Sequence, residues 1–202
     1  MGIFDNYRKK DNKIDAFAYS DKLFNEGRYQ EAIKVLDIAI ETEPTNWYSY
    51  FRKGKCFQYM NYFDKAILEY EKGRRFEDNF DLNRGLGECY LMTEQWFKGK
   101  NSLLKAYRLL LDLEKSQSNK KFGNDKANVL NNLAIALYNL DEIEDAIKYS
   151  EDGIKFDPNF SGNYRVLGTI LLSYDNLKGI KLLKQAANLG DEMAKSILND
   201  IL

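Results

Sequence analysis

Small and apolar residues recur along the chain at the spacing of one face of an α-helix. Near the amino terminus they stand at i, i+3, i+4 and i+7, on Ala16, Tyr19, Ser20 and Leu23. The next stretch carries a similar helical pattern on Tyr29, Ala32, Leu36 and Ala39. Gly27 separates the two stretches and Pro44 follows the second, and both residue types end helices. We therefore expect residues 13–46 to form two amphipathic helices joined by a turn.

This two-helix pattern returns with a period of roughly 34 residues. Its clearest copies are NEGRYQEAIKVLDIAIETEP at 25–44 and NLDEIEDAIKYSEDGIKFDP at 139–158, in which Ala32 corresponds to Ala146. A functional site rarely occurs twice in one chain, so we interpret the pattern as a structural unit. Placing the rest of the chain in the same register gives five units, at residues 13–46, 47–79, 80–113, 127–160 and 161–190.

Three segments lie outside the five units. Residues 1–12 form an N-terminal extension, and the polar stretch EKSQSNKKFGNDK at 114–126 is an insertion that follows a lengthened helix. Residues 191–202 are expected to form a helix that caps the exposed apolar end of the stack. The apolar face of this helix is expected to carry Met193, Ile197, Leu198 and Ile201. A surface for homodimer formation is the alternative interpretation of this face.

Glycine stands at equivalent places in three units, at Gly54, Gly87 and Gly168. Glycine inside a helix costs about 1 kcal/mol relative to alanine, so its recurrence needs a reason. We expect it to allow a close approach of the two helices of a unit, opposite a small residue such as Ala66. No alternating run is bounded by hairpin turns, so the fold class is expected to be all-α.

This pattern resembles the tetratricopeptide repeat (TPR). The residues that carry the resemblance are GRYQEAIKVLDIAIETEP, DEIEDAIKYSEDGIKFDP, YFRKGKCF and LGECY. It covers residues 13–190 and implies a right-handed α-solenoid of about five helix-turn-helix repeats. AANLGDEMAKSIL at 186–198 is similar to a Sel1-like unit junction, so the last repeat is expected to be of that variant. Asp78 replaces the closing proline of the second unit, and Gly99 replaces the alanine of the third.

Composition narrows the classes of partner. Basic and acidic residues are balanced, 30 against 31, and the basic residues form no long cluster, so a nucleic-acid partner is not expected. The chain has no signal-like amino terminus and no run near the roughly 18 apolar residues of a membrane span. We therefore expect a cytoplasmic protein that does not bind membranes.

The absence of histidine removes most common catalytic arrangements. With 0 histidines the chain has no Ser-His-Asp or Cys-His nucleophile system and no HExxH zinc site. Its 2 cysteines cannot make a structural zinc site alone. We expect no catalytic residues, no metal site, no cofactor and no enzyme activity. Cys56 and Cys89 hold equivalent places in adjacent units, and we expect both thiols to be reduced and buried.

The resemblance implies a concave groove, lined by the first helix of each unit, that takes a peptide or a partner helix. The predicted peptide-binding residues are Phe17, Tyr48, Phe51, Lys55, Arg84, Asn128, Asn131, Tyr138 and Arg165. Further groove positions hold Asp21, Phe24, Tyr59, Glu88, Met92, Ile135, Thr169 and Leu172. Aromatic rings would bury apolar side chains, asparagine amides would bond a peptide backbone, and arginines would hold carboxylates. The alternative is that several of these residues merely fill gaps between units.

One known version of such a groove is not expected here. Chaperone-tail binding uses lysine, asparagine and arginine at positions that in this chain hold Phe17, Asp21, Arg52, Asp81 and Gly85. Our first hypothesis is therefore an adaptor or scaffold that binds a peptide segment or helix of another protein. The alternatives are a chaperone-like holder of a secreted or assembling partner, and a homo-oligomeric structural protein.

Overall fold

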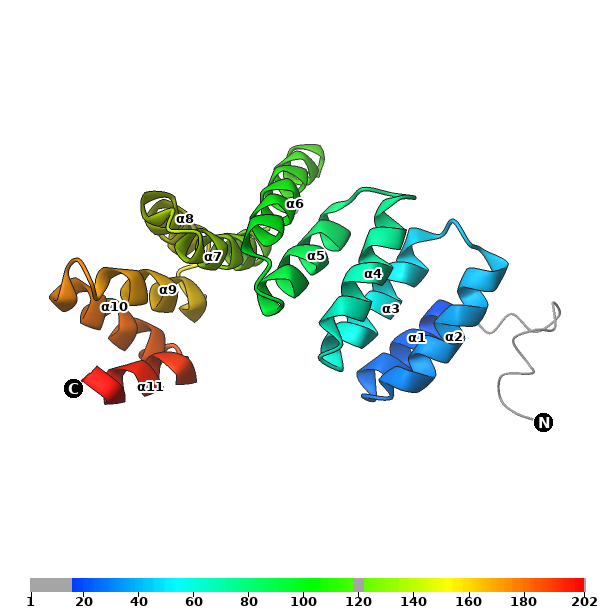
Figure 1. Ribbon diagram of the computed structural model, residues 1–202, viewed down its shortest axis with the longest axis horizontal. Coiled ribbons are helices and arrows are strands. Elements are labelled where there is room, and N and C mark those ends of the chain that lie inside the picture. Colours follow the sequence, from blue (N-terminus) through cyan, green and yellow to red (C-terminus); the bar gives the residue numbers. More distant parts are fainter. Residues whose placement is uncertain (1–15, 118–121, 202) are drawn as a thin grey trace. The chain divides into compact units, whose positions relative to one another are not determined.

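The computed structural model describes residues 16–117 and 122–201, and Figure 1 shows them as helices joined by short turns. Every regular element in these two ranges is an α-helix, which confirms the all-α prediction. The predicted N-terminal extension, residues 1–12, lies outside the described residues, as do the middle of the predicted insertion and Leu202. The described helices fall into two compact units, one ending at Thr93 and one beginning at Glu94.

Unit 1 contains five helices that pack in chain order. They are α1 (Ala16–Asn25), α2 (Tyr29–Thr42), α3 (Trp47–Tyr59), α4 (Phe63–Arg74) and α5 (Phe80–Met92). Each helix packs against the next, and α3 also contacts α5. The first helices of the predicted repeats therefore lie next to one another, with α3 between α1 and α5.

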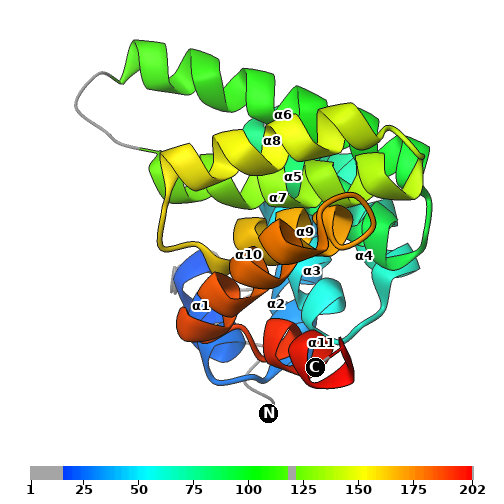
Figure 2. The same cartoon turned by 90° about the vertical axis from the view of Figure 1, so that its left-hand side faces the viewer.

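Unit 2 contains six helices. They are α6 (Trp96–Ser116), α7 (Gly123–Asn139), α8 (Ile143–Phe156), α9 (Ser161–Leu171), α10 (Asn176–Asn188) and α11 (Glu192–Ile201). Helix α7 packs against α6, α8 and α9, and α11 packs on α10 (Figure 2). Helix α6 has 21 residues, which agrees with the lengthened helix expected before the insertion. The division into five repeats stays a prediction.

Three of the turns inside helix hairpins share one backbone feature. A residue with positive φ stands at the turn between α1 and α2, between α3 and α4, and between α7 and α8, at Gly27 (φ 74°), Asn61 (φ 60°) and Asp141 (φ 62°). Glycine, asparagine and aspartate are the residue types that adopt this left-handed conformation most readily. The same local chemistry thus ends the first helix of three hairpins.

The core of unit 1 is built around an aromatic ring. Tyr70 of α4 is fully buried, and its hydroxyl donates a hydrogen bond to Gln58 Oε1 at 2.6 Å. A Cβ on Gly54 would lie 2.5 Å from the Tyr70 ring, and one on Gly85 would lie 2.7 Å from it. Gly54 therefore makes room for a ring of α4, and its expected position opposite the small residue Ala66 stays a prediction.

In unit 2 a glycine pair does bring two helices together. A Cβ on Gly179 of α10 would lie 2.9 Å from the carbonyl oxygen of Gly168 of α9 and 2.8 Å from the backbone nitrogen of Leu172. The helices of this hairpin cross too closely for a side chain at these positions. The expected close approach at Gly168 is confirmed, and its partner in α10 is a second glycine.

Helix α11 covers part of the apolar end of unit 2. Ala194 and Leu198 pack on Leu183 and Ala186 of α10. The predicted apolar face of α11 is only partly used, because Met193 and Ile201 are 63% and 43% exposed. None of the described helices combines the length and the apolar character that a membrane span requires.

The two cysteines are free and buried, as the sequence predicted. Cys56 lies in α3 and Cys89 in α5. Burial among apolar side chains disfavours the thiolate, and it raises the pKa of Cys56 to about 11 and that of Cys89 to about 12. Both thiols are therefore neutral near pH 7.

Candidate functional site

The predicted peptide-binding residues are distributed over both units, and each group is described separately. Helices α1, α3 and α5 of unit 1 carry Phe17, Tyr48, Phe51, Lys55 and Arg84. Helices α7 and α9 of unit 2 carry Asn128, Asn131, Tyr138 and Arg165. All nine residues lie on first helices of the predicted hairpins. Their contacts differ strongly between the units.

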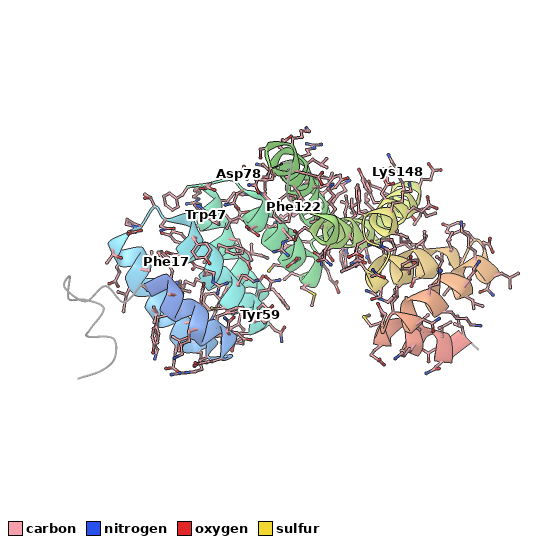
Figure 3. The ribbon with its side chains drawn as sticks, turned by 180° about the vertical axis from the view of Figure 1, so that it is seen from behind. Phe17, Trp47, Tyr59, Asp78, Phe122 and Lys148 are labelled. Carbon is pink, nitrogen blue, oxygen red and sulfur yellow. The ribbon has the colours of Figure 1, made fainter. Side chains whose placement is uncertain are left out.

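Ring contacts join α1 to α3 in unit 1. Phe17 and Tyr48 meet edge to face with ring centroids 5.6 Å apart, and Phe24 meets Tyr59 in the same way at 5.0 Å. Figure 3 labels Phe17 on α1 and Tyr59 at the end of α3. Tyr59 is 56% exposed, so the second ring pair presents apolar surface to solvent. The first-helix face of unit 1 is formed by residues of α1, α3 and α5. These are Phe17, Asp21, Phe24, Tyr48, Arg52, Lys55, Gln58, Tyr59, Asp81, Arg84 and Glu88.

Two cations of α3 lie over these rings. The Arg52 guanidinium is 4.8 Å from the centroid of the Phe24 ring, and it forms an ion pair with Asp21 of α1. The Lys55 ammonium lies 5.8 Å from the Phe24 centroid and 5.7 Å from the Tyr59 centroid. Both distances are within the range of cation–π attraction. Arg52 is absent from the predicted set, although it lies one turn after Tyr48 and therefore on the same face.

Helix α5 adds a third cation. The Arg84 guanidinium lies 3.5 Å from Asp81 and 3.7 Å from Glu88, both in its own helix. Glu88 Oε2 also accepts a hydrogen bond from Gln58 of α3 at 2.8 Å, which connects α3 and α5 at this face. The Arg84 Nε–H is buried and has no hydrogen-bond acceptor among the described residues. The Arg84 guanidinium also lies 5.3 Å from the centroid of the Phe80 ring, so its contacts within α5 are two long ion pairs and one aromatic ring.

Phe51 differs from the other predicted residues of unit 1. Its side chain is only 8% exposed and belongs to the core cluster that contains Tyr70, whose ring centroid lies 6.0 Å away. Tyr48 is half-buried, and burial is the main reason why the pKa of its hydroxyl is raised. Phe51 thus packs into the core beneath the first-helix face, whereas Tyr48, Lys55 and Tyr59 form the part of this face that is nearer to solvent.

Two of the three predicted residues on α7 of unit 2, Asn128 and Asn131, carry side-chain amides. Asn131 is 6% exposed, and its Oδ1 is buried with no donor among the described residues. A Cβ on Gly162 of α9 would lie 2.8 Å from that oxygen. Asn128 Oδ1 accepts a 3.4 Å hydrogen bond from Asn132, whereas Tyr138 is 42% exposed. Asn131 lies at the contact between α7 and α9.

Arg165 of α9 is engaged within unit 2. Its Nε donates a 3.0 Å hydrogen bond to Oδ2 of Asp191, and Oδ1 of the same aspartate accepts the backbone N–H of Ala194 at the start of α11. The Arg165 side chain is 19% exposed, and that of Asp191 is 10% exposed. Arg165 therefore fixes α11 to α9. The sequence contains both residues but does not show that they meet.

Comparisons with known proteins agree with the helical-repeat fold. Residues 127–160 match the sequence model of the tetratricopeptide repeat family. The fold is a TPR-type helical repeat. No curated protein matches the chain significantly.

Solved structures of TPR-type proteins match the chain over most of its length. The structure titled "Crystal structure of YrrB: a TPR protein with an unusual peptide-binding site" has a TM-score of 0.72 and 18% identity, covering 95% of this chain and 94% of that one. A MamA structure has a TM-score of 0.70 and 20% identity, covering 87% and 96%. A structure of pilF from Pseudomonas aeruginosa has a TM-score of 0.71 and 16% identity, covering 87% and 75%. At these identities the likeness concerns the fold.

Within residues 16–117 and 122–201, no group of three or more aspartate, glutamate or cysteine side chains is placed to hold a metal ion. The first-helix face of unit 1 instead combines solvent-exposed rings with positive charges. Such a surface suits recognition of a chain that offers apolar and polar groups in alternation.

Proposed function

We propose that the chain is a protein-interaction scaffold, and that the first-helix face of unit 1 binds a peptide segment or a helix of another protein. The observation that carries this proposal is the exposed aromatic and cationic surface on α1, α3 and α5. Tyr59 is 56% exposed, so this face has apolar surface that the core does not use. Met92, a further predicted groove position at the end of α5, is 62% exposed. Tyrosine and arginine are the residue types that most often dominate binding at protein interfaces.

The comparisons support a binding role in general terms. YrrB is described as a TPR protein with a peptide-binding site, and its fold is similar to that of this chain. The amide of Asn128 and the exposed ring of Tyr138 remain part of the proposal as a second contact region in unit 2, whereas Asn131 contributes less because it is buried at the contact between α7 and α9. Arg165 contributes less to it, because Asp191 already occupies its guanidinium.

A selection experiment tests the proposal. The full chain is used to select binders from a library of random short peptides, and the affinity of the selected peptides is then measured for single variants. Tyr59→Ala and Tyr48→Ala remove rings of the first-helix face, and each is expected to weaken binding by about tenfold or more. Leu68→Ala is the matched control, because Leu68 of α4 is 55% exposed but lies on a second helix.

The control decides between two surfaces of unit 1. If Leu68→Ala weakens binding while Tyr59→Ala does not, the working surface is formed by the second helices and the proposal is wrong. Thermal melting of each variant shows whether a loss of affinity comes from unfolding.

Self-association is a second candidate function, favoured by the exposed Met193 and Ile201 of α11. In this case the chain would form a homo-oligomer through its last helix. The molar mass in solution, measured for the natural chain and for the double variant Met193→Ser/Ile201→Ser, tests the idea. A monomer at all concentrations contradicts it, and an oligomer that the double variant abolishes supports it. Binding of unfolded partners without sequence preference would instead favour the chaperone-like alternative.

A further inference from the structure

The hairpin of α9 and α10 in unit 2 has an excess of basic residues, although the net charge of the whole chain is −1. Between residues 161 and 188 a single acidic residue stands against four basic ones, which are Arg165, Lys178, Lys181 and Lys184. All three lysines lie on α10 and are exposed, and α10 contains no acidic residue. The balanced composition of the chain therefore conceals a local concentration of positive charge.

The carboxylates that border α10 are engaged by other groups. Asp175 Oδ1 accepts a backbone N–H in the first turn of α10 at 3.1 Å. Asp191 Oδ2 accepts a hydrogen bond from Arg165 at 3.0 Å, and Glu192 pairs with Lys195 at 2.7 Å. Within residues 16–117 and 122–201, no carboxylate lies at ion-pair distance from any of the three lysines of α10. Their positive charges are therefore available to an anionic partner.

Two large apolar side chains lie beside these lysines, at the turn between α9 and α10. Leu177 and Tyr174 are 83% and 67% exposed, the highest values among the large hydrophobic residues of the described ranges. Positions i, i+4 and i+7 lie on one side of a helix, and in α10 they hold Leu177, Lys181 and Lys184. The opposite side is buried and consists of Gly179, Leu183 and Ala186. The outer face of α10 thus combines exposed apolar groups with unpaired lysines.

This combination suits a surface of anionic lipid. Such a surface attracts lysine and arginine side chains, and leucine and tyrosine side chains enter the boundary between headgroups and acyl chains. Lysine carries a compact charge on a flexible stem, which suits mobile lipid phosphates, whereas arginine forks suit a fixed carboxylate. A protein ligand usually places its anchors in well-packed pockets. Tyr174 and Leu177 are too exposed to form the wall of such a pocket.

We propose that the outer face of α10 and the turn before it bind peripherally to membranes that contain anionic lipids. Lys178, Lys181 and Lys184 contact lipid phosphates, while Tyr174 and Leu177 insert between the headgroups. The helix lies on the membrane surface, because its buried side already packs within unit 2.

The inference goes beyond the proposed function and does not rest on it, since it uses a different surface. It also departs from our expectation that the chain does not bind membranes. That expectation relied on the charge balance of the whole sequence and on the lack of a spanning segment, and neither describes the outer face of one helix.

The experiment measures how much of the full chain floats with lipid vesicles. The vesicles contain phosphatidylcholine alone, or phosphatidylcholine and phosphatidylglycerol in equal parts. Lys181→Gln/Lys184→Gln removes two charges from α10, and Lys181→Arg/Lys184→Arg keeps them. The matched control, Lys148→Gln/Lys155→Gln, removes two exposed lysines from α8, where Lys155 is paired with Asp152 at 2.8 Å and Lys148 is labelled in Figure 3.

The natural chain is expected to bind the phosphatidylglycerol vesicles, to leave the phosphatidylcholine vesicles free, and to bind less as salt rises. Each lysine near an anionic surface contributes about fivefold in affinity, so Lys181→Gln/Lys184→Gln is expected to weaken binding about twentyfold. The arginine variant and the α8 control are expected to change it much less. Tyr174→Ser/Leu177→Ser is expected to weaken binding about tenfold, and melting curves show whether each variant is folded.

Several results would overturn the inference. One is a natural chain that does not float with the phosphatidylglycerol vesicles, and another is an equal loss of binding in the α8 control. Binding to soluble polyglutamate without binding to vesicles would assign the lysines to an acidic protein segment. A molar mass that falls when the lysines are changed, again without vesicle binding, would assign them to a second copy of the chain. None of these results affects the peptide selection, so the inference and the proposed function fail separately.

Discussion

The two units fill the space between their helices with different side chains. In unit 1 the ring of Tyr70 lies between Gly54 and Gly85, and further rings pair across α1 and α3. In unit 2 the backbones of Gly168 and Gly179 approach directly, and the largest fully buried side chains are aliphatic, Leu103, Leu110, Leu130, Leu133, Ile170 and Leu183. The same repeat pattern therefore permits two kinds of packing.

Their first-helix positions differ in a parallel way. In unit 1 these positions carry exposed rings and a lysine without a carboxylate partner among the described residues, whereas in unit 2 the arginine is already bound by Asp191. Polar side chains that already pair with one another inside a unit have few hydrogen-bonding groups left to bind a ligand. On this comparison the binding surface that we propose lies mainly in unit 1, and the following predictions test or sharpen the comparison.

The largest expected effect concerns Tyr70. Tyr70→Ala removes a fully buried ring and should lower the free energy of unfolding by about 3–5 kcal/mol, against about 2–5 kcal/mol for Leu133→Ala in unit 2. Tyr70→Phe keeps the ring and loses only the hydrogen bond to Gln58, which should cost about 1 kcal/mol. The measurement is denaturant unfolding, followed by Trp47 fluorescence in a Trp96→Phe background for the Tyr70 variants and by Trp96 fluorescence in a Trp47→Phe background for Leu133→Ala. A loss below that of Tyr70→Phe would show that the ring does not organise unit 1.

The glycines provide the second test. Gly179→Ala places a Cβ against backbone atoms, and we expect a net loss of about 1–2 kcal/mol after the gain in helix propensity. The Cβ added by Gly54→Ala would clash with the ring of Tyr70, so the smaller side chain of Tyr70→Leu should reduce the loss of stability that Gly54→Ala causes. A double-mutant cycle for Gly54 and Tyr70 measures this coupling, with exposed Lys181→Ala as the control in α10. Additive effects would mean that Gly54 and Tyr70 do not compete for space.

The third test uses the thiols of unit 1. The pKa values of Cys56 and Cys89 are raised from 9.0 to about 11 and about 12, so the unfolded chain loses these protons first as pH rises. The stabilisation is complete below about pH 9 and is lost between pH 9 and the folded pKa, by at most about 1.4 kcal/mol per pH unit and thiol. Unfolding at about pH 7.5 and about pH 10 measures the loss, which Cys56→Ala/Cys89→Ala should reduce. An unchanged loss in that variant would assign it to other groups.

The smallest expected effect is similar in the two units. Asn79 accepts a 3.1 Å hydrogen bond from the backbone N–H of Leu82 at the start of α5, and Asp175 accepts one of 3.1 Å from that of Lys178 in α10. Replacing either cap by alanine should cost about 1 kcal/mol. Thermal or denaturant unfolding measures both losses, with Trp47 reporting on unit 1 and Trp96 on unit 2. Strongly unequal losses would show that the units differ in local helix stability as well as in packing.

Much of the fold could be predicted, because the signals are local. The apolar spacing around Ala32 and the glycine at Gly27 predict a helix and the turn before it, and the structure has α2 from Tyr29 to Thr42. Asn61 and Asp141 perform the same turn function with less specific residue types, so the sequence alone indicates them only weakly. The candidate site was harder to predict. The periodicity places Phe51 and Lys55 on the same helix, but it does not show that Phe51 is buried against Tyr70.

By itself, the sequence determined the helices, the hairpin turns and the repeat, because 3.6-residue periodicity and helix-ending residues act within a few positions of the chain. It also placed rings and cations on the first helices. Only the tertiary structure decided which of them remain available for a ligand. Asp191 reaches Arg165 from 26 residues further on, and Asp21 reaches Arg52 from the neighbouring first helix, whereas no described carboxylate lies within ion-pair distance of Lys55. Pairing across helices depends on distances in space, and the spacing of residues along the chain does not contain them.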